Sequence, residues 1–247
     1  MTSWVVGDIH GCARELEQLF ERLELGAQDR LISVGDLFHR GPDACGVMEL
    51  LEQVGGLFIL GNHEHAVLER CGLSPGLVAS DGQVLKRTTF PSLSSDDLAG
   101  DGRRAITAAV SRLPELLHFL QSHSGYYLEH EGVPSAGTTP DGRSWCVVHA
   151  GRTPGREASE SSIDDLIYPA RLAVRRRPFW FQGYTGPKLV LYGHLPEGEP
   201  RQTFHDGKLV ALGLDTGCVY GGKLTAYSPE LDRFESVPAR KRYAQFH

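Results

Sequence analysis

The sequence lacks the cysteine spacing of a disulfide framework or of a thiolate zinc site. Its five cysteines, in a chain of 247 residues, are odd in number and far apart, and no CxxC pair occurs. Small disulfide-rich domains and zinc ribbons need paired or closely spaced cysteines. We therefore predict reduced thiols in a cytoplasmic protein. The cysteines are Cys12, Cys45, Cys71, Cys146 and Cys218.

Long uncharged hydrophobic runs are also absent. No run approaches the roughly 18 apolar residues that a membrane-spanning helix needs. The short segment from Trp4 to Val6 runs directly into Asp8, and we expect no signal peptide. With 40% hydrophobic and 23% charged residues, the composition is that of an ordinary globular protein. We expect no interaction with membranes.

An excess of positive charge is missing as well. The formal net charge is -6 and the pI is near 6.0, which gives no support for a large nucleic-acid-binding surface. An anionic substrate must therefore be attracted locally, by metal ions or a few arginines. We find no linker, internal repeat or low-complexity segment, and we predict one domain over residues 1–247.

One short pattern occurs six times along the chain. Each copy is an apolar run rich in β-forming residues that ends at a polar residue with Gly or Ala beside it or nearby. Continuous apolar runs of this length are typical of strands buried on both faces. Ligands of open α/β sheets bind beyond the carboxyl ends of such strands, so we expect the six polar residues to share one site. They are Asp8, Asp36, Asn62, His149, His194 and Asp215.

Helical patterns lie between the expected strands. Residues 12–25 and 42–54 carry apolar residues near the 3.6-residue period. Residues 65–125 lack strong strand signals and include a helical pattern over 103–122, broken at Pro114, which predicts a helical insertion over the site. Turn signals within residues 203–237 predict β-hairpins.

The polar side chains at the expected strand ends form a ligand set for metal ions. Carboxylate, imidazole and carboxamide groups without cysteine suit Mn, Fe, Co, Ni or Zn. One carboxylate can bridge two ions, and two ions about 3.5–4 Å apart hold both ends of a displacement at phosphorus. A lone Gly-Asp pair is commonly a turn, and a lone buried histidine is more often a core residue. The complete set in this order is hard to assign to turns and core packing.

These motifs resemble those of the calcineurin-like metallophosphoesterases. The resemblance runs from Val5 to about Ala226 and favours the branch of Ser/Thr protein phosphatases and bacterial diadenosine tetraphosphate hydrolases. It implies an α/β (α+β) fold, a four-layer sandwich of two mixed β-sheets flanked by helices. Gly193-His194-Leu-Pro196 agrees with this branch, because other branches have Gly-His-x-His. The motifs are GDIHG (7–11), GDLFHRG (35–41), GNHE (61–64), HAG (149–151), GH (193–194) and LDTGCVYGGKLT (214–225).

The resemblance also implies a role for each motif residue. Asp8 and His10 bind a first divalent ion and Asp36 bridges it to a second, with manganese the expected metal. A metal-bridging hydroxide attacks phosphorus, since the ions lower the pKa of bound water. The remaining ligands of the second ion are Asn62, His149 and His194.

Further residues are assigned to the substrate. Arg40 would hold a phosphate oxygen with its planar guanidinium, and His63 would protonate the leaving oxygen as general acid. Asn62, Arg152 and Arg171 are further candidates for contacts with the substrate. Asp215 lies at a strand end, where we expect it to support the metal ligands.

Weaker signals concern two short segments. Arg175 to Arg177 could contact additional phosphates, although a solvated surface is the more common role of such a run. Phe179 to Phe181 could stack on a nucleobase or belong to the core.

His39 departs from the protein-phosphatase pattern, in which an aspartate orients the general-acid histidine and stabilises its charged form. A histidine cannot supply that negative charge, so His63 should be a weaker proton donor. A serine alkoxide needs this proton more than a nucleotide phosphate does. Position 39 therefore favours anhydride cleavage, unless His39 is merely tolerated or makes a neutral hydrogen bond.

Three hypotheses about function follow from the sequence. The first is a hydrolase of dinucleoside polyphosphates, with a nucleotide as its partner. The second is a Ser/Thr or broad-specificity protein phosphatase acting on phosphoproteins, and the third is a non-catalytic scaffold. A scaffold would be expected to lose ligands, whereas this chain retains all of them together with Arg40 and His63. The sequence does not determine the metal, the bond cleaved in a polyphosphate or the oligomeric state.

Overall fold

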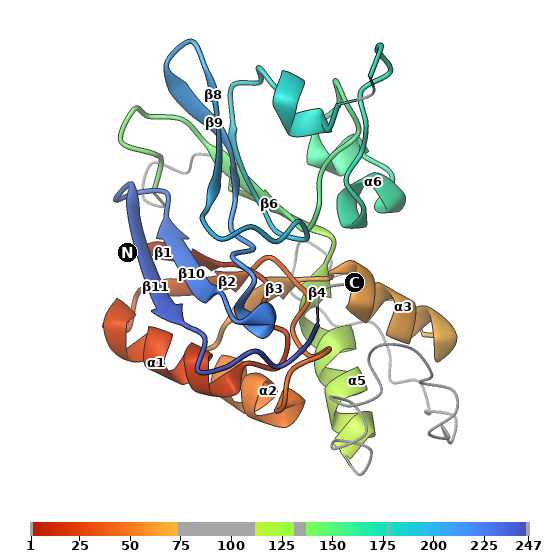
Figure 1. Ribbon diagram of the computed structural model, residues 1–247, viewed down its shortest axis with the longest axis vertical. Helices are drawn as coiled ribbons and strands as arrows, with labels where there is room; N and C mark the ends of the chain where they lie inside the picture. The colour runs from red at the N-terminus through yellow and green to blue at the C-terminus, as the bar shows by residue number, and fades with distance from the viewer. Residues whose placement is uncertain (1, 74–111, 131–136, 177, 246–247) are drawn as a thin grey trace.

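Two β-sheets pack face to face in the computed structural model, which describes residues 2–73, 112–130, 137–176 and 178–245 (Figure 1). We call the six-stranded sheet sheet A and the five-stranded sheet sheet B. In spatial order, sheet A contains β11 (Arg233–Pro238), β10 (Lys223–Ser228), β1 (Ser3–Val6), β2 (Arg30–Ser33), β3 (Leu57–Ile59) and β4 (Ser124–Gly125). Sheet B contains β5 (Tyr127–His130), β6 (Trp145–Val148), β7 (Leu189–Tyr192), β9 (Lys208–Gly213) and β8 (Arg201–His205).

Both sheets are mixed. In sheet A, β1, β2, β3 and β4 are parallel, whereas β10 and β11 form an antiparallel hairpin beside β1. In sheet B, β6, β7 and β9 are parallel, with antiparallel β5 and β8 at the edges. Sheet A thus has four neighbouring parallel strands and sheet B has three, and the carboxyl ends of these strands lie at the edges that carry the site.

Alternating side chains along the strands build separate hydrophobic cores. In β1, Val5 packs between the two sheets, while Trp4 and Val6 face the helices on the other side of sheet A. In β6, Val147 joins the inter-sheet core and Val148 faces the outer layer. Since both faces of the central strands are covered, their runs are continuously apolar. The predicted four-layer α/β sandwich is confirmed.

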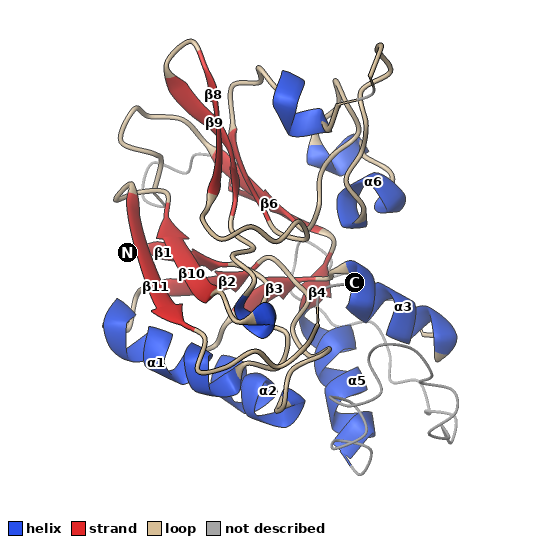
Figure 2. Ribbon diagram, in the orientation of Figure 1, coloured by secondary structure: helices blue, strands red, loops and turns tan. Residues whose placement is uncertain are grey.

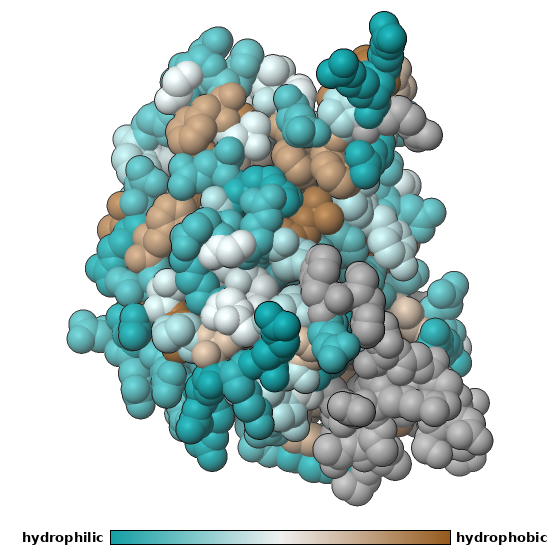
Figure 3. Space-filling model, in the orientation of Figure 1, coloured by the Kyte–Doolittle hydropathy of each residue, from teal (hydrophilic) through white to brown (hydrophobic). Residues whose placement is uncertain are grey.

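Helices α1 (Ala13–Leu23), α2 (Ala44–Gln53), α3 (Asn62–Arg70) and α5 (Leu113–His123) contribute to the core beneath sheet A (Figure 2). On α1, Leu16 and Leu19 are fully buried, and burial of such a side chain contributes about 1.5–3 kcal/mol. Asp43 caps α2 by accepting a hydrogen bond from the backbone N–H of Gly46 at 2.8 Å. Much of the face in Figure 3, including the outer surface over α1 and α2, is hydrophilic.

The outer face of sheet B carries shorter elements. They are α6 (Ile163–Ile167) and the 3-10 helices η2 (Ala158–Glu160) and η3 (Trp180–Gly183). Trp180 is buried there and donates from its indole N–H to the carbonyl of Ala150 at 2.9 Å. Phe181 packs in the same core, and Phe179 packs partly buried against it. A third 3-10 helix, η4 (Cys218–Tyr220), precedes β10.

The helices predicted over 12–25 and 42–54 are present as α1 and α2, and the C-terminal hairpins are β8–β9 and β10–β11. Within the predicted insertion, α3 and α5 are helical, and residues 74–111 lie outside the described part. Pro114 is the second residue of α5, where a missing N–H costs no helical hydrogen bond, and residues 103–111 of the predicted helical pattern lie outside the described part. Among the described residues, no helix is long and apolar enough to cross a membrane.

Candidate active site

Six predicted residues lie where the parallel strands of the two sheets end. Asp8, Asp36 and Asn62 follow β1, β2 and β3 of sheet A. Their counterparts in sheet B follow β6, β7 and β9, and they are His149, His194 and Asp215. Figure 1 shows these strand ends at the junction of the two sheets, beside the start of α3.

The side chains form two groups that share Asp36. One group contains Asp8, His10 and Asp36, and the other contains Asp36, His149 and His194. Within each group the potential ligand atoms lie within 4.8 Å of one another. A carboxylate common to two such groups is positioned to bridge two cations.

His149 shows how the lone pairs converge. Its Nδ1 lies 2.9 Å from the carbonyl oxygen of Val34, which can only accept, so Nδ1 carries the proton. The lone pair of Nε2 therefore faces Asn62 Oδ1 and His194 Nδ1, each 3.1 Å away. The Asn62 oxygen and the His149 Nε2 lone pair thus lie at hydrogen-bond distance with no proton between them. A cation bound between such lone pairs would stabilise this arrangement.

The two sheets are also joined directly at the site. The backbone N–H of His194 donates to both carboxylate oxygens of Asp8 at 3.1 Å. A Cβ on Gly193 would lie 2.0 Å from Asp8 Oδ1, and one on Gly61 would lie 2.1 Å from Asp36 Oδ1. These two glycines therefore permit the carboxylates to approach the backbone, and a side chain at either position would displace a ligand.

Backbone conformation at the site is strained. His10, Asp36, Arg40 and His194 have positive φ angles of 49°, 51°, 72° and 69°. This left-handed region is uncommon for residues other than glycine and costs of order 1–3 kcal/mol each. Such strain persists only where the surrounding structure holds the backbone in place. Here the four residues lie where sheets A and B meet.

Glu64 anchors the loop that carries Asp36. Its buried carboxylate accepts hydrogen bonds from the backbone N–H groups of Asp36 at 2.8 Å, Leu37 at 2.9 Å and Gly61 at 3.1 Å. Burial raises the pKa of Glu64 to about 8, and the three donors oppose that shift. One side chain thus ties the first turn of α3 to the strand end of β2.

Burial largely sets the protonation states of the site. It lowers the pKa of His10 well below its ordinary value and that of His194 to about 4, so both rings are neutral near pH 7. Burial raises the pKa of Asp215 to about 7. The pKa of Asp36 lies well below its ordinary value although burial opposes its ionisation, so Asp36 is a carboxylate near pH 7. Carboxylates and neutral imidazoles concentrated in this way favour a bound cation.

The site opens into a cavity of about 290 Å³. Arg40 lies in its wall with a guanidinium nitrogen 3.2 Å from His10 Nε2 and the guanidinium carbon 5.7 Å from the Tyr220 ring centroid. His63 lies in the wall as well, with Nε2 3.8 Å from Asp36 Oδ2. A phosphate group in the cavity would therefore meet the metal-ligand candidates, a guanidinium and an imidazole. His10 Nδ1 is buried without a hydrogen-bond partner among the described residues.

His39 lies directly beside His63. Their ring centroids are 4.6 Å apart, and His39 Nδ1 is 4.0 Å from Glu64 Oε1. Burial, followed by the charge of His63, lowers the pKa of His39 to about 3. His39 is therefore neutral near pH 7 and supplies no negative charge to its neighbour.

Two arginines predicted to bind substrate lie outside this cavity. Arg152 lines a second cavity, of about 280 Å³, where it contacts Glu157 and the hydroxyl of Tyr184. Arg171 is exposed, with its guanidinium 3.7 Å from the centre of the Phe179 ring. Neither forms part of the wall of the cavity that contains the clustered ligands.

Other residues of the site were missed by reasoning from sequence. The sequence indicates part of the hydrogen bonding of Glu64, because Gly61-x-x-Glu64 is a capping pattern at the start of a helix. Tyr220 and Gln245 line the cavity; Tyr220 belongs to the motif at 214–225 but had no role assigned to it, and no local pattern marks Gln245. Their positions depend on how the C-terminal segment returns to the site.

The fold and the site together define a metal-dependent phosphoesterase. A family model for calcineurin-like phosphoesterases matches residues 1–198, and the chain belongs to this family. It is therefore a hydrolase that uses divalent metal ions, as the sequence predicted.

Three known proteins illustrate the similarity. An asymmetrical bis(5'-nucleosyl)-tetraphosphatase of Oceanobacillus iheyensis is 28% identical over 97% of this chain and 93% of its own. Serine/threonine-protein phosphatase 1 of Salmonella typhimurium is 27% identical over 90% and 89% of the two chains. A crystal structure provisionally named a diadenosine tetraphosphatase has a TM-score of 0.68 and 25% identity, covering 96% and 93%.

Proposed function

We propose that this protein hydrolyses dinucleoside polyphosphates of the diadenosine tetraphosphate type, cutting the phosphate chain asymmetrically. Relatives named asymmetrical bis(5'-nucleosyl)-tetraphosphatase support this substrate, since they are similar over nearly the whole chain. The neutral His39 against His63 is the observation that carries the preference for an anhydride over a serine phosphate.

Two divalent ions would be held by the clustered ligands. Asp8 and His10 would bind one ion and Asp36 would contact both, with manganese the proposed metal because the donors are oxygen and imidazole nitrogen. When bound, the ions supply positive charge to the phosphate oxygens and lower the pKa of bound water. The remaining ligands of the second ion would be Asn62, His149 and His194.

The side chains of the cavity would orient the phosphate and transfer a proton. Arg40, which lines the cavity, would bind phosphate oxygen through the paired N–H donors of its planar guanidinium. Asn62, also in the wall, has an amide that can reach the same group. His63 would deliver a proton to the leaving oxygen, while Asp215 would hold the adjacent loop by accepting from the backbone N–H of Gly217 at 3.0 Å.

The leaving group distinguishes the two substrate classes. A nucleotide phosphate leaves with little help from an acid, whereas a serine alkoxide requires protonation. Since His39 cannot stabilise a protonated His63 by negative charge, the site is better matched to the nucleotide. Protein dephosphorylation is the second candidate, favoured by the similarity to serine/threonine-protein phosphatase 1.

The test is turnover of diadenosine tetraphosphate by the manganese-loaded full chain, with products separated by anion exchange. ATP together with AMP is the expected product pair, and ADP alone would contradict an asymmetric cut. Asp36→Asn is the control and should abolish turnover, since it weakens the shared ligand. Failure of the metal-loaded protein to cleave the dinucleotide would overturn the proposal.

A further inference from the structure

The end of the described chain returns to the catalytic cavity. Gln245 forms part of the cavity wall together with Tyr220 and Arg40. Asn62, the first residue of α3, lines the same cavity. These last residues follow β11, well beyond the region matched by the family model, which ends at residue 198.

The C-terminal segment is fixed in place by specific hydrogen bonds. The backbone N–H groups of Tyr243 and Ala244 donate to the carbonyl of Val219 at 2.9 and 3.0 Å. The fully buried Glu15 accepts from the hydroxyl of Tyr243 at 2.8 Å and from the backbone N–H of Arg240 at 2.9 Å. The segment is thus held against α1 and η4 and has a defined position relative to the cavity.

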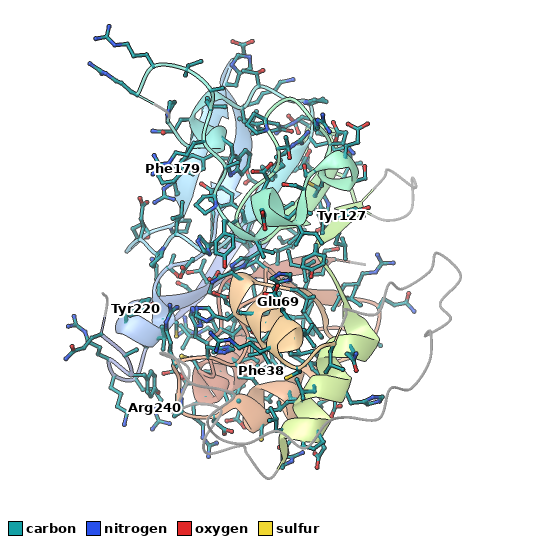
Figure 4. All side chains as sticks on the ribbon, turned by 90° about the vertical axis from the view of Figure 1, so that its right-hand side faces the viewer. Phe38, Glu69, Tyr127, Phe179, Tyr220 and Arg240 are labelled. Carbon is teal, nitrogen blue, oxygen red and sulfur yellow. The ribbon has the colours of Figure 1, made fainter. Side chains whose placement is uncertain are left out.

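Three consecutive cationic residues precede Gln245, and we call residues 240–242 the basic segment. Arg240, Lys241 and Arg242 are all exposed, and no ion pair forms to any of them within the part of the chain that the structure describes. Arg242 donates to the carbonyl of Tyr220 at 3.1 Å, so it lies next to a wall residue that itself faces Arg40. Figure 4 shows Tyr220 and Arg240 on the same side of the molecule.

This local positive charge contrasts with its surroundings. The chain has a net charge of -6, and the cavity floor contains carboxylates. A single phosphate needs only the metal-ligand site and Arg40. A chain of phosphates carries further negative charge out of the cavity, and exposed cations within about 10 Å attract it at ordinary ionic strength.

We propose that the basic segment is a subsite for the phosphates of a polyphosphate chain that extend beyond the reacting group. The inference rests on the proposed function for the identity of the natural substrate. The proposed subsite would recognise several linked phosphates and would contribute little to binding of a single phosphate. Arg240, Lys241 and Arg242 would bind the distal phosphates while Gln245 borders their exit from the cavity.

Arg175 and Arg176 provide a matched control within the same chain. Both are exposed arginines in the loop between α6 and η3, at the upper end of Figure 1, whereas Arg242 of the basic segment donates to the carbonyl of Tyr220 in the cavity wall. Their replacement removes two surface charges, against three in the basic segment, without altering the basic segment.

The experiment measures competitive inhibition of p-nitrophenyl phosphate hydrolysis by inorganic tripolyphosphate and by orthophosphate, at fixed free manganese. In the variant R240Q/K241Q/R242Q, the inhibition constant of tripolyphosphate should rise about tenfold, since exposed charge contacts contribute modestly and three are lost. The constant for orthophosphate should change much less. The control R175Q/R176Q should leave both constants as in the wild type.

An unchanged ratio of the two inhibition constants would overturn the proposal, and so would an equal rise in the control variant. All substituted side chains are exposed, so folding should be retained. A salt series gives a second measurement: tripolyphosphate binding should weaken with salt more steeply in the wild type than in R240Q/K241Q/R242Q. Equal slopes would contradict the subsite.

The outcome is separable from that of the proposed function. Turnover of diadenosine tetraphosphate by the wild type tests the function, whereas the tripolyphosphate-to-orthophosphate ratio tests the subsite and requires no dinucleotide cleavage. If the wild type does not cleave the dinucleotide but the triple variant binds tripolyphosphate more weakly than the wild type, the proposed function is refuted and the subsite is supported. If the wild type cleaves the dinucleotide but the triple variant binds tripolyphosphate equally well, the function is supported and the subsite is refuted.

Discussion

At the scale of single residues, position 39 connects local chemistry with substrate choice. His39 packs against His63, and burial lowers its pKa to about 3, so it offers neither a carboxylate nor a positive charge near pH 7. The residue therefore limits how readily His63 holds a proton for a poor leaving group.

Replacement of His39 by aspartate should improve hydrolysis of poor leaving groups. The new carboxylate would stabilise a protonated His63, and we expect kcat on a phosphoserine peptide to rise by about tenfold, within the usual contribution of acid catalysis. Turnover of diadenosine tetraphosphate should change little. His39→Asn is the control, since it has a similar shape without charge, and an equal gain in both variants would contradict the electrostatic explanation.

At the scale of elements, each sheet contributes ligands through the same local unit, a buried strand followed by a turn. This unit was predictable because an apolar run that ends in a small residue and a polar one is visible in the sequence. Asp8, Asp36 and His194 were located in this way, and their strand ends do converge. The orientation of Arg152 was not predictable, since its partners Glu157 and Tyr184 belong to later segments that pack only in the folded chain.

The hydrogen bonds of Glu64 should control the position of Asp36. In Glu64→Gln, one carboxamide oxygen replaces two carboxylate oxygens and the amide N–H₂ is left buried without an obvious acceptor. We expect a loss of about 2–4 kcal/mol in the free energy of unfolding, from unmet buried hydrogen bonds, together with reduced metal-dependent activity.

Urea denaturation of the metal-free proteins measures that loss. Glu69→Gln, an exposed glutamate on the same helix α3, is the matched control and should change stability by less than about 0.5 kcal/mol. Similar stabilities for the two variants would show that Glu64 does not anchor the Asp36 loop.

At the scale of the whole molecule, the site joins the two sheets. Asp36 belongs to the edge of sheet A and His149 to that of sheet B, and their side-chain atoms lie 3.6 Å apart. Bound cations would therefore connect the two halves of the sandwich. The predicted sandwich architecture was confirmed, whereas the return of Gln245 to the cavity depends on long-range contacts with Glu15 and Val219 that no sequence pattern reveals.

Removal of metal should consequently destabilise the whole fold. Saturation at about 1,000 times the dissociation constant stabilises the folded state by about 4 kcal/mol. For a chain of this size, that corresponds to a fall in Tm of about 8–16 °C on chelation. Differential scanning calorimetry with and without EDTA measures it, and Asp36→Ala should show little response. An unchanged wild-type Tm would contradict a metal site between the sheets.

The most direct test of the proposed function is a comparison of kcat/KM for manganese-loaded wild type on diadenosine tetraphosphate and on a phosphoserine peptide. We predict a value at least about tenfold higher for the dinucleotide, because a nucleotide phosphate leaves without the strong acid that His39 withholds. An equal or higher kcat/KM on the peptide would contradict this account and identify the protein as a protein phosphatase.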